Sequence, residues 1–355
     1  MNYKFINREI SWLQFNERVL QEACDPNVPL MQRLQFLGIF SNNQDEFFKV
    51  RVANIMRLCR SRKNSGKLLT GDYTPESLLE ELNEKIALLQ EHFSATYQSV
   101  LEQMERENIF VVNEKNLNEE QKEFCRDYYA QIISPRLVPL IIRKSVKLPF
   151  LPDGNSYLGV KMSHSGKNSP RYAIVRIPTS SACPRFVVLP SAAGRHDIIF
   201  TDDIIRLMID HIFFMFSYDE IGAYTFKIMR DAELTYDEDV SKSLFERISE
   251  GVSNRRYGLP IRMIYDRDMP ADMVEILAGK LGLDNAEMLA PGERYHMMKD
   301  LMKFPKVRPD LLYASQKPIQ HPSISLFSSI LEVIAQRDIF LNYPYHTFQH
   351  FKIGR

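Results

Sequence analysis

Apolar residues in the first hundred positions recur every three or four residues, which is the spacing of amphipathic helices. The first such helix is predicted to be capped by Ser11 and to carry Trp12, Phe15, Val19 and Ala23 on one face. This opening segment therefore predicts a helix that packs through an apolar stripe.

Three more helices are predicted before residue 108. Asp25-Pro26-Asn27 breaks the first helix, and leucines continue a second helix that ends near Gly38. A third helix is expected from about Asn42 through Met56. The pair Thr74-Pro75 suits the cap and first position of a long fourth helix. The pattern predicts an antiparallel helical bundle at residues 1–108.

The period changes after about residue 108, where β-branched and aromatic runs become frequent. The fold class predicted for the chain is multidomain α and α+β: the helical bundle, a mixed α+β domain at 109–317, and the short start of a third α/β domain at 318–355. The elements expected after residue 108 are a strand or linker at 109–112, a helix at 118–133, strands at 157–162, 172–177 and 185–189, a hairpin loop at 164–170, a helix at 201–216, a strand at 222–229, a helix at 239–255, a strand at 260–266, helices at 270–282 and 294–303, and then a helix at 324–336 and a strand at 338–341.

Composition narrows the class of protein. The 355 residues are 45% hydrophobic and 25% charged with a formal net charge of zero, which suits a globular chain and disfavours non-specific nucleic-acid binding. Four scattered cysteines argue against a zinc site or a disulfide framework. With no secretory signal and no long apolar run, the chain is predicted to be cytoplasmic.

The polar run Ser41-Asn42-Asn43-Gln44-Asp45-Glu46, followed by Phe47, is placed by this prediction at the entrance of the third helix. Free backbone amides and Asn side chains at a helix start could contact a nucleotide base or phosphate. The alternative is simple helix capping, because Ser, Asn and Asp are ordinary cap residues.

Basic residues supply the remaining candidates. The acid-free run from Arg57 to Lys67 suits a polyanion, or a solvated helix end. Arg230 ends a predicted strand, and Arg294 follows a turn; either could face phosphate or form a structural ion pair.

Known catalytic signatures are missing: the sequence has no P-loop, GxGxxG, HExxH or GxSxG motif. His350-Phe351-Lys352 matches only the first part of an HxKxxxxD signature, and we interpret it as chance. From the residues alone, no catalytic residue and no metal ligand is predicted.

Two long segments, Asn7 to Ala23 and Pro29 to Arg51, resemble the opening of polyphosphate kinases. Shorter segments that resemble the same family follow in order at 172–174, 184–187, 230–233, 266–270, 292–296 and 343–348. The similarity runs from about residue 5 to residue 351 and is lost at Lys352, so the resemblance implies a chain truncated before the catalytic half.

The resemblance implies reversible transfer of the terminal phosphate of ATP to inorganic polyphosphate through a phosphohistidine. It implies a helical N-terminal domain, a head domain used in dimerisation, and two phospholipase-D-like C-terminal domains that hold the catalytic histidines and the magnesium site. It assigns Asn43 to adenine-nucleotide contact. Arg51, Arg230 and Arg294 are the candidates to face phosphate.

The resulting expectation is an ATP-contacting and dimerising part of a polyphosphate kinase, inactive alone. Its partners would be ATP or ADP, polyphosphate and a second copy in a homodimer or higher homo-oligomer, but no nucleic acid. Mg²⁺ is expected for the full-length family, and peripheral membrane association of the full enzyme is not readable from these residues. The alternative is a non-catalytic polyphosphate-binding, nucleotide-binding or dimerisation fragment.

Overall fold

The chain divides into two compact units, residues 1–309 and 310–355, each of which is described by itself. The computed structural model describes residues 6–60, 73–143, 145–164, 167–231, 258–283, 285, 288–314, 316–322, 324 and 330–347.

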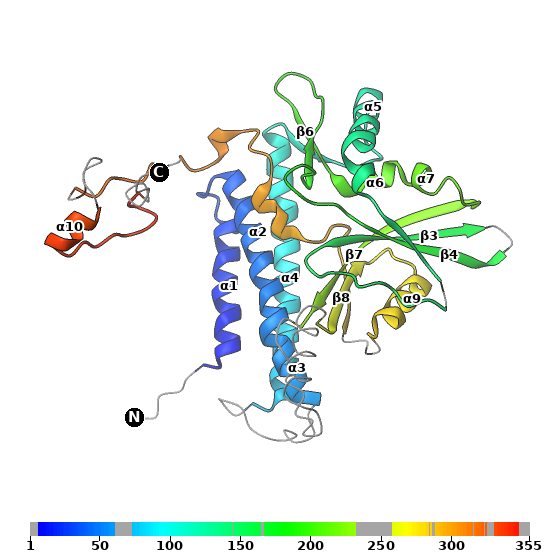
Figure 1. Ribbon diagram of the computed structural model, residues 1–355, viewed down its shortest axis with the longest axis horizontal. Coiled ribbons are helices and arrows are strands. Elements are labelled where there is room, and N and C mark those ends of the chain that lie inside the picture. Colours follow the sequence, from blue (N-terminus) through cyan, green and yellow to red (C-terminus); the bar gives the residue numbers. More distant parts are fainter. Residues whose placement is uncertain are drawn as a thin grey trace. The chain divides into compact units, whose positions relative to one another are not determined.

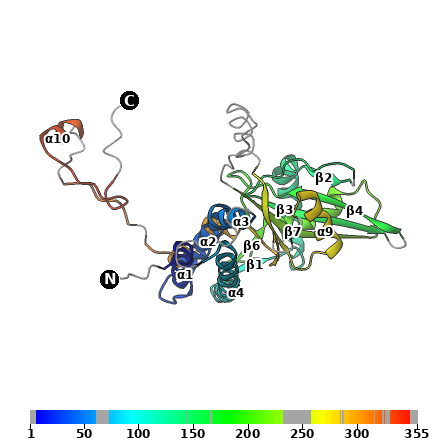
Figure 2. The ribbon, with the colours of Figure 1, turned by 90° about the horizontal axis from the view of Figure 1, so that it is seen from below.

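The first unit begins with the predicted helices. Long helices α1, α2 and α4 lie alongside one another (Figure 1), and Figure 2 shows them nearly end-on beside the sheet. The bounds are α1 (Arg8–Cys24), α2 (Leu30–Phe47), the π-helix η1 (Phe48–Val52), α3 (Ala53–Arg60) and α4 (Pro75–Arg106).

The buried face of α1 differs from the predicted one. Asn7, not Ser11, caps the helix, and its side chain accepts a hydrogen bond from the Glu9 amide. The face that packs inward carries Ile10, Leu13, Asn16, Leu20 and Ala23. The predicted stripe shares only Ala23 with this face, and the side chain of Phe15 remains 57% exposed.

The second and third predicted helices are largely one helix. α2 runs without a break through Gly38 and Ser41 as far as Phe47, so the polar run lies inside a helix and not at its entrance. A glycine costs only about 1 kcal/mol inside a helix, which tertiary packing outweighs. The backbone amides of the run are therefore used by the helix, and only its side chains can contact a ligand.

Two predicted helix starts are confirmed in detail. Thr74 and Ser77 form a reciprocal capping box at the start of α4. Asn118 and Gln121 form another at the start of α5 (Glu119–Tyr128).

Two sheets follow the helices. The larger sheet has the order β2-β4-β3-β7-β8-β9, antiparallel except for the parallel pair β8 and β9. The smaller has the order β1-β6-β5. The strands are β1 (Ile109–Val112), β2 (Pro139–Ile142), β3 (Ser156–His164), β4 (Lys167–Arg176), β5 (Phe186–Val188), β6 (His196–Phe200), β7 (Glu220–Arg230), β8 (Pro260–Asp266) and β9 (Leu289–Gly292).

Alternation along the strands builds two hydrophobic cores. Leu158 and Val160 of β3 face a core shared with α5 and α6 (Thr201–Leu207). Tyr157, on the other side of the same strand, joins a core with α9 (Ala271–Leu281). Figure 1 shows α6 and α7 (Ile209–Ile212) on one side of the larger sheet and α9 on the other.

The predicted strands of this domain are confirmed, and three other predicted elements change. The predicted helix 201–216 is split into α6 and α7, and the expected hairpin loop is shorter because β4 already begins at Lys167. The predicted helix 294–303 is a 3₁₀ helix, η6 (Met298–Lys303). The predicted helix 239–255 lies outside the described residues.

The second unit contains α10 (Ile330–Gln336), within the predicted helical stretch. The predicted strand 338–341 is wrong: these residues are irregular, and the Phe340 side chain is 80% exposed. In the described part of this unit no strand lies beside them, and an apolar run without a partner cannot form a sheet. The structure does not show a phospholipase-D-like domain start.

Gly38 marks the place where η6 crosses α2. A Cβ atom at Gly38 would lie 2.8 Å from the backbone nitrogen of Met302, closer than such atoms approach. We predict that Gly38→Ala lowers the free energy of unfolding by about 1–3 kcal/mol, because the backbone must shift.

The matched control is Gly279→Ala in α9, where a Cβ would meet nothing within 4 Å. That change should stabilise by up to about 1 kcal/mol, since Ala is the better helix former. Urea unfolding of both variants checks this, and equal effects at the two positions would contradict the close crossing.

Candidate nucleotide-contacting site

The amide of Asn43 lies between α1 and α2 and is half-buried. Its Nδ2 atom donates to Oδ1 of Asn16, 3.1 Å away on α1. Asn16 is fully buried, and its own Nδ2 donates to the Phe40 carbonyl and to Oε1 of Gln44. Asn43 is therefore anchored from one side and open on the other.

Aromatic rings lie one helical turn from this amide pair. Trp12 of α1 stacks on Phe47 of α2, with ring centroids 4.6 Å apart and an interplanar angle of 15°. Both helices place these rings four residues from the amides, on the same side of the helix. The exposed ring of Phe15 is next to Asn16 in sequence. The seam between α1 and α2 thus combines polar and flat apolar groups.

Arg51 faces the same pair of helices. Its Nε lies 3.9 Å from Oε2 of Glu9 on α1, and its side chain is 40% exposed. Glu9 is also bound by Arg8 at 2.7 Å. Asn43 and Arg51 are therefore brought to one seam, separated along the helices by about 10–12 Å at 1.5 Å per residue.

Arg230 and Arg294 contact the sheet domain instead. Arg230 donates to the carbonyls of Leu151 and Gly258, and its guanidinium lies over the Phe150 ring. Arg294 donates to Glu114 at 2.6 Å and to Asp203 at 2.8 Å. The contacts of Arg294 are those of a structural ion pair.

Sequence reasoning missed the ion pair that joins the helices to the sheet. Nζ of Lys227 on β7 lies 2.7 Å from Oδ1 of Asp45 on α2, and both residues are buried. A lysine inside the apolar strand sequence Phe226-Lys227-Ile228-Met229 was the available signal, because an unpaired charge there would be costly. Asn16, polar within the apolar face of α1, was a similar signal.

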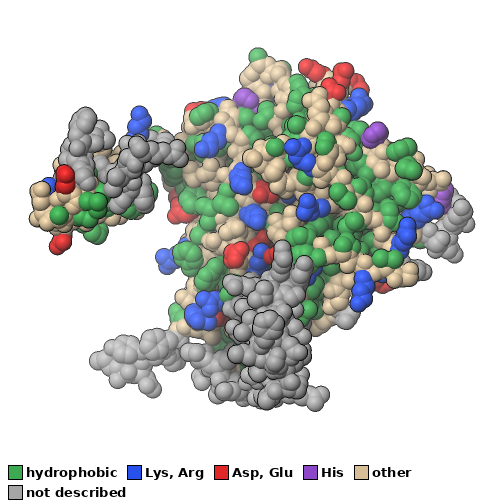
Figure 3. Space-filling view, in the orientation of Figure 1, with side chains coloured by type: hydrophobic (Ala, Val, Ile, Leu, Met, Phe, Trp, Pro, Cys, Tyr) green, Lys and Arg blue, Asp and Glu red, His purple; other side chains and the backbone are tan. Residues whose placement is uncertain are grey.

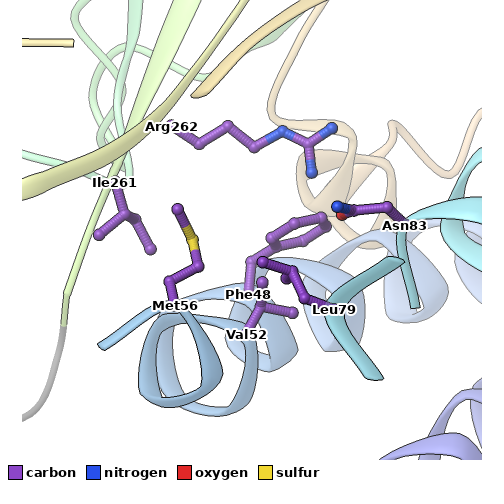
Figure 4. A pocket seen from close by; sticks show the side chains of 7 residues that line it. All are labelled: Phe48, Val52, Met56, Leu79, Asn83, Ile261 and Arg262. Carbon is purple, nitrogen blue, oxygen red and sulfur yellow. The ribbon is translucent and has the colours of Figure 1, made fainter. Parts of the chain in front are cut away.

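Arg262 of β8 adds a second cation near Asp45. Its guanidinium lies 4.2 Å from the centre of the Phe48 ring, and burial lowers the pKa of Arg262 to about 10, an effect that the Asp45 carboxylate opposes. Figure 4 shows this guanidinium beside Asn83 in a small pocket. The other side chains that line the pocket are apolar: Phe48, Val52, Met56, Leu79 and Ile261.

Lys and Arg side chains gather near the middle of the face in Figure 3, among a few acids. Two ion pairs between a basic and an acidic side chain join the helical segment to the sheet domain: Lys49 to Asp153 at 2.8 Å, and Arg57 to Asp231 at 3.5 Å. The acid-free basic run predicted from the sequence continues past Arg60 outside the described residues.

His296 is buried, and its Nε2 lies 3.2 Å from the Thr225 carbonyl. Burial, together with the nearby Lys227 charge, lowers the pKa of His296 to about 3. This histidine is therefore neutral at physiological pH and is placed to hold β7, not to accept phosphate.

In the part of the chain that the structure describes, no group of three or more His, Cys, Asp or Glu residues could hold a metal ion. No helix among them is long and apolar enough to cross a membrane.

Family models match most of the chain. Residues 5–112 match the polyphosphate kinase N-terminal domain, and residues 120–304 match the polyphosphate kinase middle domain.

The sequences of individual polyphosphate kinases are also similar to this chain. The chain is 39% identical over 351 residues to that of Vibrio parahaemolyticus, 40% over 353 residues to that of Vibrio cholerae, and 37% over 353 residues to that of Escherichia coli K12. Each match covers 98% of this chain and 49–50% of the relative. The crystal structure of polyphosphate kinase from Porphyromonas gingivalis matches with a TM-score of 0.76 and 26% identity, over 98% of this chain and 48% of that one.

The chain therefore belongs to the polyphosphate kinase family. It contains the N-terminal and middle domains, and it spans about half the length of the curated relatives it matches.

We predict that Lys227→Met or Asp45→Leu alone lowers the free energy of unfolding by about 3–5 kcal/mol, since each leaves a buried charge unpaired. The double variant should recover much of that loss. The matched control is Lys122→Met, which removes an exposed ion pair to Glu119 and should cost less than about 1 kcal/mol. Chemical denaturation of the unsubstituted chain, the two single variants, the double variant and the control checks this. A loss in the double variant equal to the sum of the two single losses would contradict a coupled pair.

We predict that His296 makes stability fall as the pH drops below about 6.5. The folded pKa lies below the unfolded one, so the unfolded chain binds the extra proton and is favoured between the two values. The loss at pH 5 is about 2 kcal/mol. His296→Gln, whose amide can still donate to Thr225, should show a shallower decline between pH 7 and pH 5. Equal slopes in urea unfolding would refute the assignment.

Proposed function

We propose that this chain supplies the adenine-nucleotide contact of a polyphosphate kinase, and that Asn43 makes it. The observation that carries the proposal is the amide of Asn43: it is anchored by Asn16, and its Oδ1 accepts no hydrogen bond from the described residues. A free amide edge beside the stacked rings of Trp12 and Phe47 suits a purine, which offers hydrogen-bonding atoms on its edge and a flat apolar face.

We further propose that the phosphates lie toward Arg51. The seam between Asn43 and Arg51 is long enough for a nucleotide to reach from base to phosphate chain, and Arg51 remains 40% exposed. Arg230 is a weaker candidate because backbone carbonyls and Phe150 already hold its guanidinium. The contacts of Arg294 to two carboxylates support a structural role instead.

We propose that the complete enzyme transfers the terminal phosphate of ATP to inorganic polyphosphate and that it forms a homodimer or higher homo-oligomer. The family membership supports this. We propose, from the resemblance, that the phosphohistidine and the magnesium ligands belong to the C-terminal domains of the complete enzyme. Assayed alone, the chain is therefore expected to bind nucleotide without making polyphosphate from ATP.

We predict that Asn43→Ala weakens ATP binding to this chain about tenfold, because one hydrogen-bonded contact is worth about 1.4 kcal/mol. The control is Asn42→Ala, a half-buried neighbour on α2 that points about 100° away around the helix. Isothermal titration calorimetry with ATP measures both variants. Equal affinities of Asn43→Ala and the unsubstituted chain would overturn the assignment of the site.

A further inference from the structure

The orientation of two side-chain amides can be traced to one backbone carbonyl. Nδ2 of Asn16 lies 3.2 Å from the oxygen of Phe40. A carbonyl oxygen can only accept, so the NH₂ end of Asn16 must face it. The second hydrogen of that NH₂ group reaches Oε1 of Gln44 at 3.3 Å.

The orientation of the Asn16 amide also fixes the orientation of the Asn43 amide. With its NH₂ group turned to Phe40, Asn16 presents Oδ1 to α2, and Nδ2 of Asn43 donates to it over 3.1 Å. If the amide of Asn43 were reversed, two oxygens would face each other at that distance. The open edge of Asn43 is therefore its Oδ1 atom with the one remaining N–H beside it.

We propose that Asn16 is a positioning residue that sets the direction of the Asn43 amide and thereby selects adenine over guanine. The inference rests on the proposed function, in which Asn43 contacts the base. Asn16 itself is fully buried, so its role in this proposal is to orient Asn43 and not to contact the base.

The chemistry of the two bases makes the direction matter. Adenine offers an N–H donor at N6 beside an acceptor at N1, whereas guanine offers an acceptor at O6 beside an N–H donor at N1. For a base held in one orientation by stacking, an amide of fixed direction pairs with one pattern and opposes the other. An amide that is free to turn over can pair with either base. Loss of the hydrogen bond from Asn43 to Asn16 should therefore lower the preference for ATP over GTP more than it lowers the affinity for ATP.

A matched pair of substitutions separates this role from a purely structural one. Asn16→Leu keeps the approximate volume but gives Asn43 no acceptor, so the amide is released. Asn16→Asp keeps an acceptor toward Asn43: a carboxylate can only accept, and a protonated carboxyl group can donate to Phe40 while its other oxygen accepts from Asn43. Both variants disturb a buried site and are expected to unfold at lower temperature than the unsubstituted chain.

The experiment measures ATP and GTP affinity by calorimetry for the chain and for both variants, at a temperature where all three are folded. We expect the chain to prefer ATP about tenfold, the ratio for one well-directed contact. The preference should persist in Asn16→Asp and fall to about one in Asn16→Leu.

A ratio unchanged in Asn16→Leu, while Asn43→Ala still weakens ATP, would overturn the positioning role and leave the proposed function standing. An ATP affinity that does not respond to Asn43→Ala would overturn both. Loss of selectivity in Asn16→Leu and Asn16→Asp alike would show a structural effect only and would also overturn the positioning role.

A second readout does not need a nucleotide. In the ¹H–¹⁵N spectrum of asparagine-labelled chain, the one side-chain N–H proton of Asn43 that is bonded to Asn16 should exchange slowly in the unsubstituted protein and in Asn16→Asp, and fast in Asn16→Leu. Equal exchange in all three would contradict the hydrogen bond on which the inference depends.

Discussion

The buried ion pair between Asp45 and Lys227 determines how α2 meets the sheet. A pair taken out of water is tolerated only where the geometry is good, and here the atoms are 2.7 Å apart with both side chains buried. The pair holds α2 against β7 at one point and in one rotation about its axis. Because Asn43 is two residues earlier, about 200° around the helix, the same rotation turns its amide toward α1.

The remaining contacts follow from this placement. Gly38, two turns before Asp45, lets η6 cross α2 closely. Lys49, one turn after Asp45, forms an ion pair with Asp153. The π-helix η1 begins directly after α2 and brings Phe48 under Arg262 and Arg51 toward Glu9. The seam between α1 and α2, where we propose that the nucleotide binds, and the sheet thus lie on two sides of one helix, which is why the family's N-terminal and middle domains form one compact unit here.

Local signals predicted much of the fold. Thr74 and Asn118 are strong caps whose helices begin where expected, and the two β-rich runs at 157–162 and 172–177 with a polar loop between them predicted the hairpin of β3 and β4. The predictions that failed concern positions where contacts with distant residues determine the secondary structure. Gly38 does not end a helix, since packing against η6 requires a residue without Cβ there. The apolar run at 338–341 is not a strand, since strand formation needs a neighbour that local sequence cannot reveal.

The proposed site depends on residues that the sequence alone did not bring together. The resemblance singled out Asn43, and reasoning from the helix entrance offered both backbone amides and Asn side chains for the contact; α2 uses those backbone amides internally, which leaves the side chains. The partners that orient Asn43 and α2, Asn16 and Lys227, come from distant segments. Each was visible only as a polar residue in an apolar pattern.

Native-state hydrogen exchange tests most directly whether α2 and the sheet are held as one body. The amides of α2 near Asp45 and those of β7 near Lys227 should open together, with one free energy and one denaturant dependence. If the α2 amides exchange through a separate opening of markedly lower free energy while β7 stays protected, the ion pair does not unite the two domains and the account is wrong.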